Sequence, residues 1–316
     1  MIRVVVDSLT KRRLSAPELD ALVRRVLGVP LAEHVELTDG MFNAAYRLTA
    51  ADGREVVLKV APPPDVPLLT HERDLMRTEA LVFGLMAAHG LPVPEVLFHE
   101  DGLLLMTALK GESWMSARPR LSDAEHGALR CELGAVVRRL HEITGDVFGY
   151  VQGPNGPTWR EAFTAMVDAV LADADRFGVE LPAGLRQAVE DRAHTLDEVS
   201  ERVLVHFDLW EANIFLAGGQ GEALRIEGII DPERAVFGDP VAEFATVALF
   251  TEVDPDFMAG YGLTGFTAAE RTRLDLYRGY LCLVMVVEAV PRGYAGEEHE
   301  ARMRFYREQL VGYLGL

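Results

Sequence analysis

The stretch LVHFDLWEANIF, residues Leu204–Phe215, decides the expected fold because polar side chains interrupt strand-like apolar sequence in a regular order. His206 comes first, Asp208 follows two residues later, and Asn213 lies five residues after Asp208. A second apolar run follows a glycine-rich turn and ends in Asp231. This pattern predicts a β-like island that carries a carboxylate, an amide and a second carboxylate in sequence.

These side chains are suited to chemistry on a nucleoside triphosphate. Mg²⁺ prefers oxygen ligands, which Asn213 and Asp231 can supply. Asp208 is then the candidate base that accepts a proton from a hydroxyl group and orients its oxygen for attack. The same order of groups occurs in the catalytic segment of protein kinases. The competing interpretation is that Asp208 and Asn213 only cap local turns.

A lysine in the first half of the chain adds a partner for phosphate groups. Lys59 lies in a strand-like apolar run, where a lysine is costly unless it is paired. Glu79, in the following helix, could pair with Lys59 and direct it at the phosphates. Backbone amides in the turn that contains Gly40 and Asn43 could cover the phosphates. The alternatives are a lysine whose charge reaches solvent, a solvated Glu79 and a plain turn.

The distribution of strand and helix signals predicts two lobes. The first hundred or so residues are rich in strand and turn signals, whereas the remainder is mainly helical. A helix is expected from Leu185 to Val203. Three further helix starts are marked by capping boxes at Ser15, Ser122 and Thr267. We therefore expect an α+β fold with a small antiparallel N-lobe over residues 1–107 and a larger helical C-lobe over residues 108–316.

The chain as a whole resembles the aminoglycoside phosphotransferase family. The blocks that carry the resemblance are Gly40–Tyr46, Leu58-Lys59, Glu79, Leu104–Met106, His206–Asn213, Ile230-Asp231 and Gly238–Pro240. The resemblance implies a protein-kinase-like bilobal fold with ATP or GTP and Mg²⁺ in the cleft. It further implies that the helical lobe holds the acceptor.

The resemblance also implies roles for residues outside the Asp208 segment. Met106, Thr107 and Leu109 would receive the nucleotide base. His206 and Asp239 would support the segment around Asp208, with Asp239 bonded to its backbone.

The chain departs from the family pattern at two positions. Glu243 stands where relatives usually have aspartate, and Pro232 follows Asp231 where an aromatic residue is common.

The resemblance does not identify the acceptor. The acidic balance favours a cationic antibiotic, such as an aminoglycoside or a tuberactinomycin-type peptide. The alternatives are a metabolic kinase acting on a sugar, choline, homoserine or a ketosamine, and a pseudokinase that only binds nucleotide. Candidate acceptor contacts are Trp210, Glu211, Glu243 and Glu288.

Composition limits the possible partners. The 49 acidic and 31 basic side chains leave a formal charge of −18, which disfavours binding to nucleic acid or an anionic membrane. The two cysteines fit neither a metal site nor a disulfide framework. An acidic residue interrupts the apolar start of the chain, so no signal peptide is expected. We expect a cytoplasmic monomer or homodimer that binds a nucleotide and a small molecule.

Overall fold

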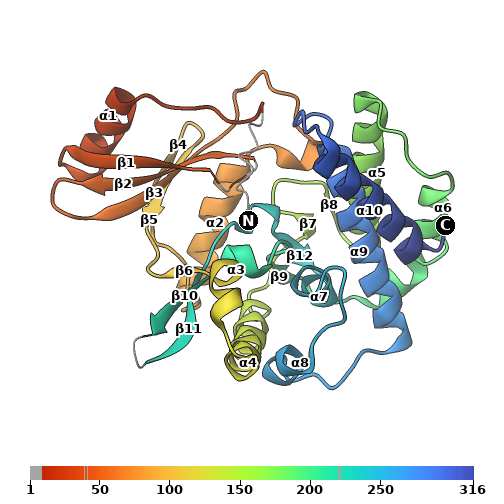
Figure 1. The fold of residues 1–316 in the computed structure, drawn as a ribbon. Coiled ribbons are helices and arrows are strands. Elements are labelled where there is room, and N and C mark those ends of the chain that lie inside the picture. Colours follow the sequence, from red (N-terminus) through yellow and green to blue (C-terminus); the bar gives the residue numbers. More distant parts are fainter. Residues whose placement is uncertain (1–8, 39, 41, 220–221) are drawn as a thin grey trace.

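A computed structural model describes residues 9–38, 40, 42–219 and 222–316. The predicted segments Met1–Asp7 and Gln220-Gly221 lie outside these residues. Figure 1 shows a small lobe built on a sheet and a larger, mainly helical lobe beside it. The predicted α+β, protein-kinase-like bilobal fold is therefore confirmed.

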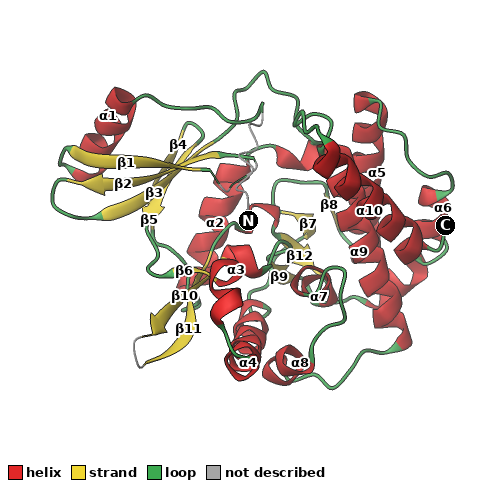
Figure 2. Ribbon diagram, viewed as in Figure 1, coloured by secondary structure: helices red, strands yellow, loops and turns green. Residues whose placement is uncertain are grey.

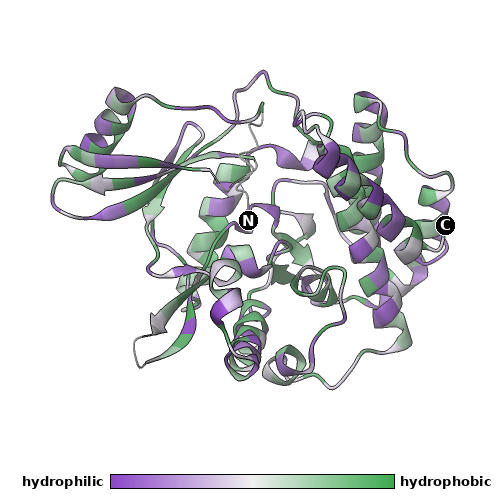
Figure 3. Cartoon of the chain, in the orientation of Figure 1, coloured by the Kyte–Doolittle hydropathy of each residue, from purple (hydrophilic) through white to green (hydrophobic). Residues whose placement is uncertain are grey.

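The small lobe is built on a five-stranded antiparallel sheet with the order β1-β2-β3-β5-β4. Along β2, buried and half-buried residues alternate strictly, as expected for a strand with a different environment on each face. Figure 3 shows hydrophilic and hydrophobic residues mixed along the strands of this sheet. The strands are β1 (Leu31–Leu37), β2 (Ala44–Ala50), β3 (Glu55–Val60), β4 (Val96–Glu100) and β5 (Leu103–Thr107).

Two helices cover opposite faces of this sheet. Helix α1 (Ala16–Leu27) begins at the predicted capping box, in which the Ser15 N–H donates to Glu18 Oε2 at 2.8 Å. It ends at Gly28, whose φ of 75° suits glycine. Its apolar face packs on the side chains of Leu48 and Leu58. Helix α2 (Leu75–Ala88), preceded by the 3₁₀ turn η1 (Thr70–Glu72), packs on the other face.

Two smaller sheets lie at the junction with the large lobe. One has the order β11-β10-β6 and the other β8-β7-β12-β9. Ile214 pairs with Ile229, so Asn213 and Asp231 lie at the same end of the β10–β11 hairpin. The strands are β6 (Glu112–Ser113), β7 (Phe148–Tyr150), β8 (Asn155–Gly156), β9 (Val203–Val205), β10 (Ile214–Gly219), β11 (Glu222–Ile229) and β12 (Val236–Gly238).

Helices form most of the large lobe (Figure 2). A continuous apolar core joins them, with the fully buried Trp159, Phe163 and Tyr277 among its largest side chains. The helices are α3 (Trp114–Ala117), α4 (Asp123–Leu140), α5 (Trp159–Phe177), α6 (Leu185–Glu190), α7 (Val241–Val247), α8 (Pro255–Tyr261), α9 (Ala268–Glu288) and α10 (Glu297–Leu314). The 3₁₀ turns are η2 (Arg118–Arg120), η3 (Ala193–Glu198), η4 (Glu211–Asn213) and η5 (Pro232–Arg234). In the described part of the chain, no helix combines the length and apolar character needed to cross a membrane.

The helix predicted from Leu185 to Val203 is wrong. The chain forms the short helix α6 and the 3₁₀ turn η3 instead, and β9 begins at Val203. Arg273 of α9 donates to the Thr195 carbonyl at 3.2 Å, so a tertiary contact uses an oxygen that a helix would bond internally. The boundary between residues 107 and 108 stays a prediction.

Candidate active site

Strand periodicity directs Lys59 toward α2. Leu58 packs into the core shared with α1, and successive side chains of a strand point to opposite faces. Lys59 Nζ therefore meets Glu79 Oε1 at 2.7 Å, and Glu79 is fully buried. The same ammonium pairs with Asp231, which joins the small lobe to the loop after β11. Burial raises the pKa of Glu79 to about 7, although Lys59 opposes this shift.

The Asp208 loop, residues 206–213, connects β9 to β10. Asn213 Nδ2 donates to the Asp208 carbonyl at 2.8 Å and to Asp208 Oδ2 at 3.1 Å. Phe207 has a φ of 61°, a conformation that costs energy for a bulky residue and is concentrated at functional sites. Burial raises the pKa of Asp208 to about 6, and the nearby Arg234 opposes this shift.

His206 connects the Asp208 loop to the residue before Asp231. It is fully buried, and burial lowers its pKa to about 4, so the imidazole is neutral. Its Nε2–H donates to the Ile230 carbonyl at 3.0 Å, while Nδ1 accepts from the Asp208 N–H at 3.3 Å. The contacts are those of a loop-ordering residue.

Glu243 of α7 holds the backbone of the Asp208 loop, a role that we had expected of Asp239. Its carboxylate accepts from the N–H groups of His206 and Phe207 at 2.6 and 3.2 Å. Thr246 Oγ1 donates to Glu243 Oε1 and accepts from the Leu209 N–H. The side chain is fully buried, so these contacts do not support the acceptor contact predicted for Glu243, which stays a prediction.

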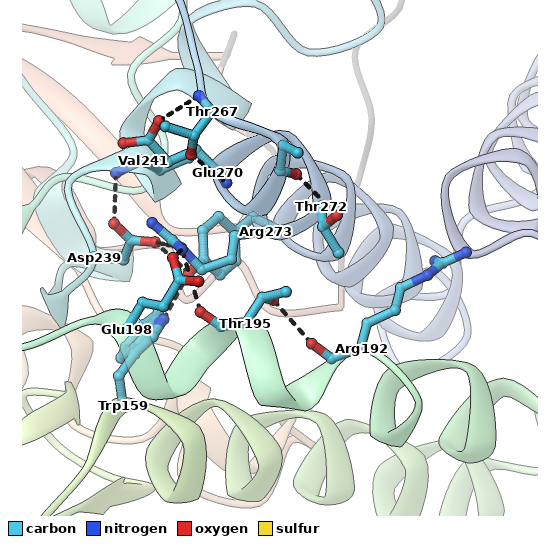
Figure 4. Close-up of polar contacts among 12 residues, drawn as sticks. Trp159, Arg192, Thr195, Glu198, Asp239, Val241, Thr267, Glu270, Thr272 and Arg273 are labelled. Carbon is cyan, nitrogen blue, oxygen red and sulfur yellow. Dashed lines mark hydrogen bonds and ion pairs between the residues drawn. The ribbon is translucent and has the colours of Figure 1, made fainter.

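Asp239 instead joins β12 and α7 to α9. Figure 4 shows Arg273 pointing from α9 toward Asp239, and the Arg273 Nε–Asp239 Oδ2 distance is 2.7 Å. Asp239 also accepts from the Val241 N–H and from the Tyr277 hydroxyl. These contacts differ from the predicted bonds to the Asp208 loop, because α9 places a cation and a hydroxyl beside Asp239.

Oxygen ligands for a metal ion gather around Asp231. One carboxylate oxygen from each of Glu79, Asp231 and Glu233 lies within 4.8 Å of the other two. Glu79 Oε2 is buried and has no hydrogen-bond partner among the described residues. Asn213 uses its Nδ2 atom on Asp208, which leaves the amide oxygen as a possible ligand. The donor set is entirely oxygen and fits Mg²⁺.

The loop between β1 and β2 is anchored to both lobes. Asn43 Nδ2 donates to Glu233 Oε2 at 2.9 Å. The Phe42 carbonyl accepts from Thr10 Oγ1 at 2.6 Å. The centre of the Phe42 ring lies 4.8 Å from the Arg292 guanidinium. Gly40, the predicted glycine of this loop, lies on the β1 side of Asn43, with room for a Cβ atom.

The residues expected at the nucleotide base lie at the end of β5. Met106 is buried, and the N–H groups of Thr107 and Ala108 are used by Glu95 and Glu55 carbonyls. The Leu109 carbonyl accepts a long hydrogen bond of 3.5 Å from Arg47.

Comparison with family models matches residues 33–277 to the phosphotransferase enzyme family, which takes in every element described above from β1 to the first half of α9. The chain belongs to this family. It is therefore a phosphotransferase, and the predicted resemblance is confirmed. No curated protein sequence matches the chain.

Solved structures show the same fold. A Thermobifida fusca protein assigned as a fructosamine-3-kinase is 22% identical, with a TM-score of 0.66 and coverage of 94% of this chain and 100% of that one. A thermostable variant of the aminoglycoside phosphotransferase APH(4)-Ia, bound to ADP and hygromycin B, is 18% identical, with a TM-score of 0.63 and coverage of 94% and 98%. A choline/ethanolamine kinase family protein from Mesorhizobium loti is 17% identical, with a TM-score of 0.58 and coverage of 95% of each chain.

The remaining acceptor candidates of this phosphotransferase differ in their surroundings. Trp210 is 47% exposed beside η4, and Glu211 is half-buried. Glu288 is buried and pairs with Arg234 at 2.8 Å and with Arg292 at 2.9 Å. Its negative charge is thus balanced by two arginines, which weakens its attraction for a cationic ligand.

Sequence reasoning missed three residues that the fold brings to the site. Glu233 and Arg234 follow Asp231 by two and three residues, and this proximity was the available signal. Arg292 follows Glu288 by four residues, and this helical spacing was the available signal for it. It pairs with Glu72 of η1 as well as with Glu288.

Proposed function

We propose that this phosphotransferase transfers the γ-phosphoryl group of ATP or GTP to a hydroxyl group of a small molecule. The observation that carries the proposal is the convergence of groups from both lobes. Lys59 of the small lobe pairs with both Glu79 and Asp231. In the large lobe, Asn213 donates to Asp208. His206 of the same loop bonds to the carbonyl of Ile230, the residue before Asp231.

The residues divide the reaction between them. Asp208 orients the acceptor hydroxyl and accepts its proton, while the acceptor oxygen bonds to the γ-phosphorus and the bond to the β–γ bridging oxygen breaks. Lys59, held by Glu79, donates to the nucleotide phosphates when they displace Asp231. Asn213 and Asp231 would hold Mg²⁺, with Glu233 close by, and the bound ion supplies neutralising charge to the phosphate oxygens.

The nucleotide would bind between the lobes. Met106, Thr107 and Leu109 would border the base, where the Thr107 N–H is already used by the Glu95 carbonyl. Gly40 and Asn43 lie in the loop that would cover the phosphates.

The acceptor class has two candidates. The acidic total of the chain supports a cationic antibiotic, and a solved neighbour of the same fold holds hygromycin B. The pairing of Glu288 with two arginines and the burial of Glu243 support a metabolic acceptor of lower positive charge. A sugar or ketosamine is such an acceptor, and a neighbour is assigned as a fructosamine-3-kinase. We favour this second class.

A transfer assay tests the proposal. γ-Labelled ATP and GTP are offered with a panel of ketosamines, sugars, choline, aminoglycosides, tuberactinomycin-type peptides and macrolides. We expect Mg²⁺-dependent labelling of an acceptor, and a loss of roughly 10²–10⁴-fold in turnover for Asp208→Asn with nucleotide affinity nearly unchanged. Nucleotide binding without transfer or hydrolysis under any condition would instead indicate a pseudokinase. Near-normal turnover of Asp208→Asn would show that Asp208 is not the base.

A further inference from the structure

In the described part of the loop between β1 and β2, Asn43 makes a side-chain hydrogen bond to one of the carboxylates around Asp231. Asn43 Nδ2 donates to Glu233 Oε2 at 2.9 Å, although the two residues are 190 positions apart in sequence. Asn43 is 8% exposed, so solvent competes little for this contact. The bond therefore links a loop of the small lobe directly to η5 of the large lobe.

Glu233 is one of the three carboxylates that could hold a cation. Its neighbours in that group, Glu79 and Asp231, come from α2 and from the end of β11. The unpartnered, fully buried Glu79 Oε2 is a second sign that this space takes a cation, because a buried carboxylate oxygen without a partner is costly. Asn43 Oδ1 is also buried without a hydrogen-bond partner among the described residues.

The position of Asn43 is set by its neighbour in the loop. Phe42 is buried, its carbonyl accepts from Thr10, and its ring stacks on Arg292, which pairs with Glu72 and Glu288. Asn43 thus presents its amide to Glu233 from a backbone that is held from two other directions. A donor held in this way restricts the rotation of the carboxylate that it contacts.

We propose that Asn43 is a positioning residue that orients the Glu233 carboxylate toward the cation, so that the loop between β1 and β2 completes the metal site. The inference rests on the proposed function, because it concerns the ion that accompanies the nucleotide. The amide donates to Oε2 and leaves Oε1 available as a ligand. Residues that orient a metal ligand typically contribute 10–100-fold to metal affinity.

Binding of Mn²⁺, measured by electron paramagnetic resonance in the presence of a saturating non-hydrolysable ATP analogue, tests this role without requiring turnover. We expect Asn43→Ala to weaken Mn²⁺ binding about tenfold. Glu233→Gln should weaken it as well, and the double variant should bind no more weakly than Glu233→Gln alone, because Asn43 acts through Glu233.

Gln187→Ala is the matched control, since it also removes an amide that donates to a carboxylate, Asp191 Oδ1 at 2.6 Å, but the pair lies at α6 and not at the metal site. Its Mn²⁺ affinity should stay within about twofold of wild type, well below the ligand-orienting effect. An unchanged affinity in Asn43→Ala, an equal loss in the Glu233→Gln background, or an equal loss in Gln187→Ala would each overturn the inference. If Asn43→Ala does not fold, Asn43→Gln keeps the amide but displaces it, and it should show the same loss.

The same measurement separates this inference from the proposed function. Wild-type protein that binds no Mn²⁺ with the nucleotide analogue would contradict the metal-dependent kinase itself. Wild-type binding that Asn43→Ala leaves intact would contradict only the role of Asn43.

Discussion

Asp208 combines burial with a hydrogen bond from Asn213, and burial raises its pKa to about 6. The residue must be ionised to accept a proton, so the ionised fraction falls about tenfold for each pH unit below that value. We expect kcat/KM to decline below pH 6 and not below pH 4, the region of an ordinary aspartate. A pH–rate profile of the free enzyme, with folding checked at each pH, measures this; an acid limb near pH 4 would contradict it.

The burial of Glu243 makes the stability of the protein depend on pH. Burial raises its pKa to about 7, so the folded protein keeps a proton that the unfolded chain releases near 4.5. The stabilisation associated with this proton is complete below pH 4.5 and is lost as the pH rises through 7. Glu243→Gln does not titrate, so its free energy of unfolding relative to wild type should increase between pH 5 and pH 7. Urea denaturation of both proteins at the two pH values measures this difference. If Glu243 does not titrate between them, the difference will stay constant.

At the scale of elements, close helix packing sets what a position tolerates. A Cβ atom at Gly260 of α8 would lie 1.9 Å from the Cys131 carbonyl oxygen of α4. Both atoms are held by backbone, so Gly260→Ala must separate the two helices, and we expect it to cost roughly 1–3 kcal/mol of stability. Thermal or urea unfolding measures this loss.

Gly84 of α2 provides the control for that substitution, because no atom lies within 4 Å of its Cβ position. Gly84→Ala should be neutral or stabilise the protein by about 0.5–1 kcal/mol, since alanine favours the helix. Equal losses in both variants would show that the α4–α8 contact is not the cause.

Local signals predicted helix starts better than helix lengths. Ser15, Ser122 and Thr267 each bond to the glutamate three residues later, as their spacing indicated. These bonds depend on neighbours within one turn, and the sequence contains both partners. The chain after Leu185 was mispredicted because Arg273, distant in sequence, bonds to the Thr195 carbonyl.

At the scale of the whole molecule, the net charge of −18 acts on any charged acceptor. Screening becomes strong beyond about 10 Å at 0.1 M salt, so the KM of a polycationic acceptor should rise with ionic strength. Because Glu288 is paired with two arginines, we favour an acceptor of low positive charge. The KM of such an acceptor should change by less than about twofold between low and moderate salt. Initial rates across a salt series, with a neutral acceptor as reference, measure this. A steep rise would favour a cationic antibiotic.

The fold class, the family and the grouping of residues around Asp208 could all be predicted from local patterns in the sequence. Asp208 and Asn213 belong to one short loop between two strands. Their spacing in the sequence was therefore enough to predict that they lie close together. Lys59 and Glu79 could also be paired, because strand alternation and the following helix left few other arrangements.

Which buried carboxylates are already paired, and so are not available to bind a ligand, depends on tertiary packing. Asp239 and Glu243 are only four residues apart, yet Glu243 faces the backbone of the Asp208 loop and Asp239 faces Arg273. Glu288 pairs with Arg292, its neighbour four residues later, and with Arg234, which is 54 positions earlier in the chain. The charge available at a buried site is a sum over neighbours from distant parts of the chain, and sequence spacing does not contain that sum.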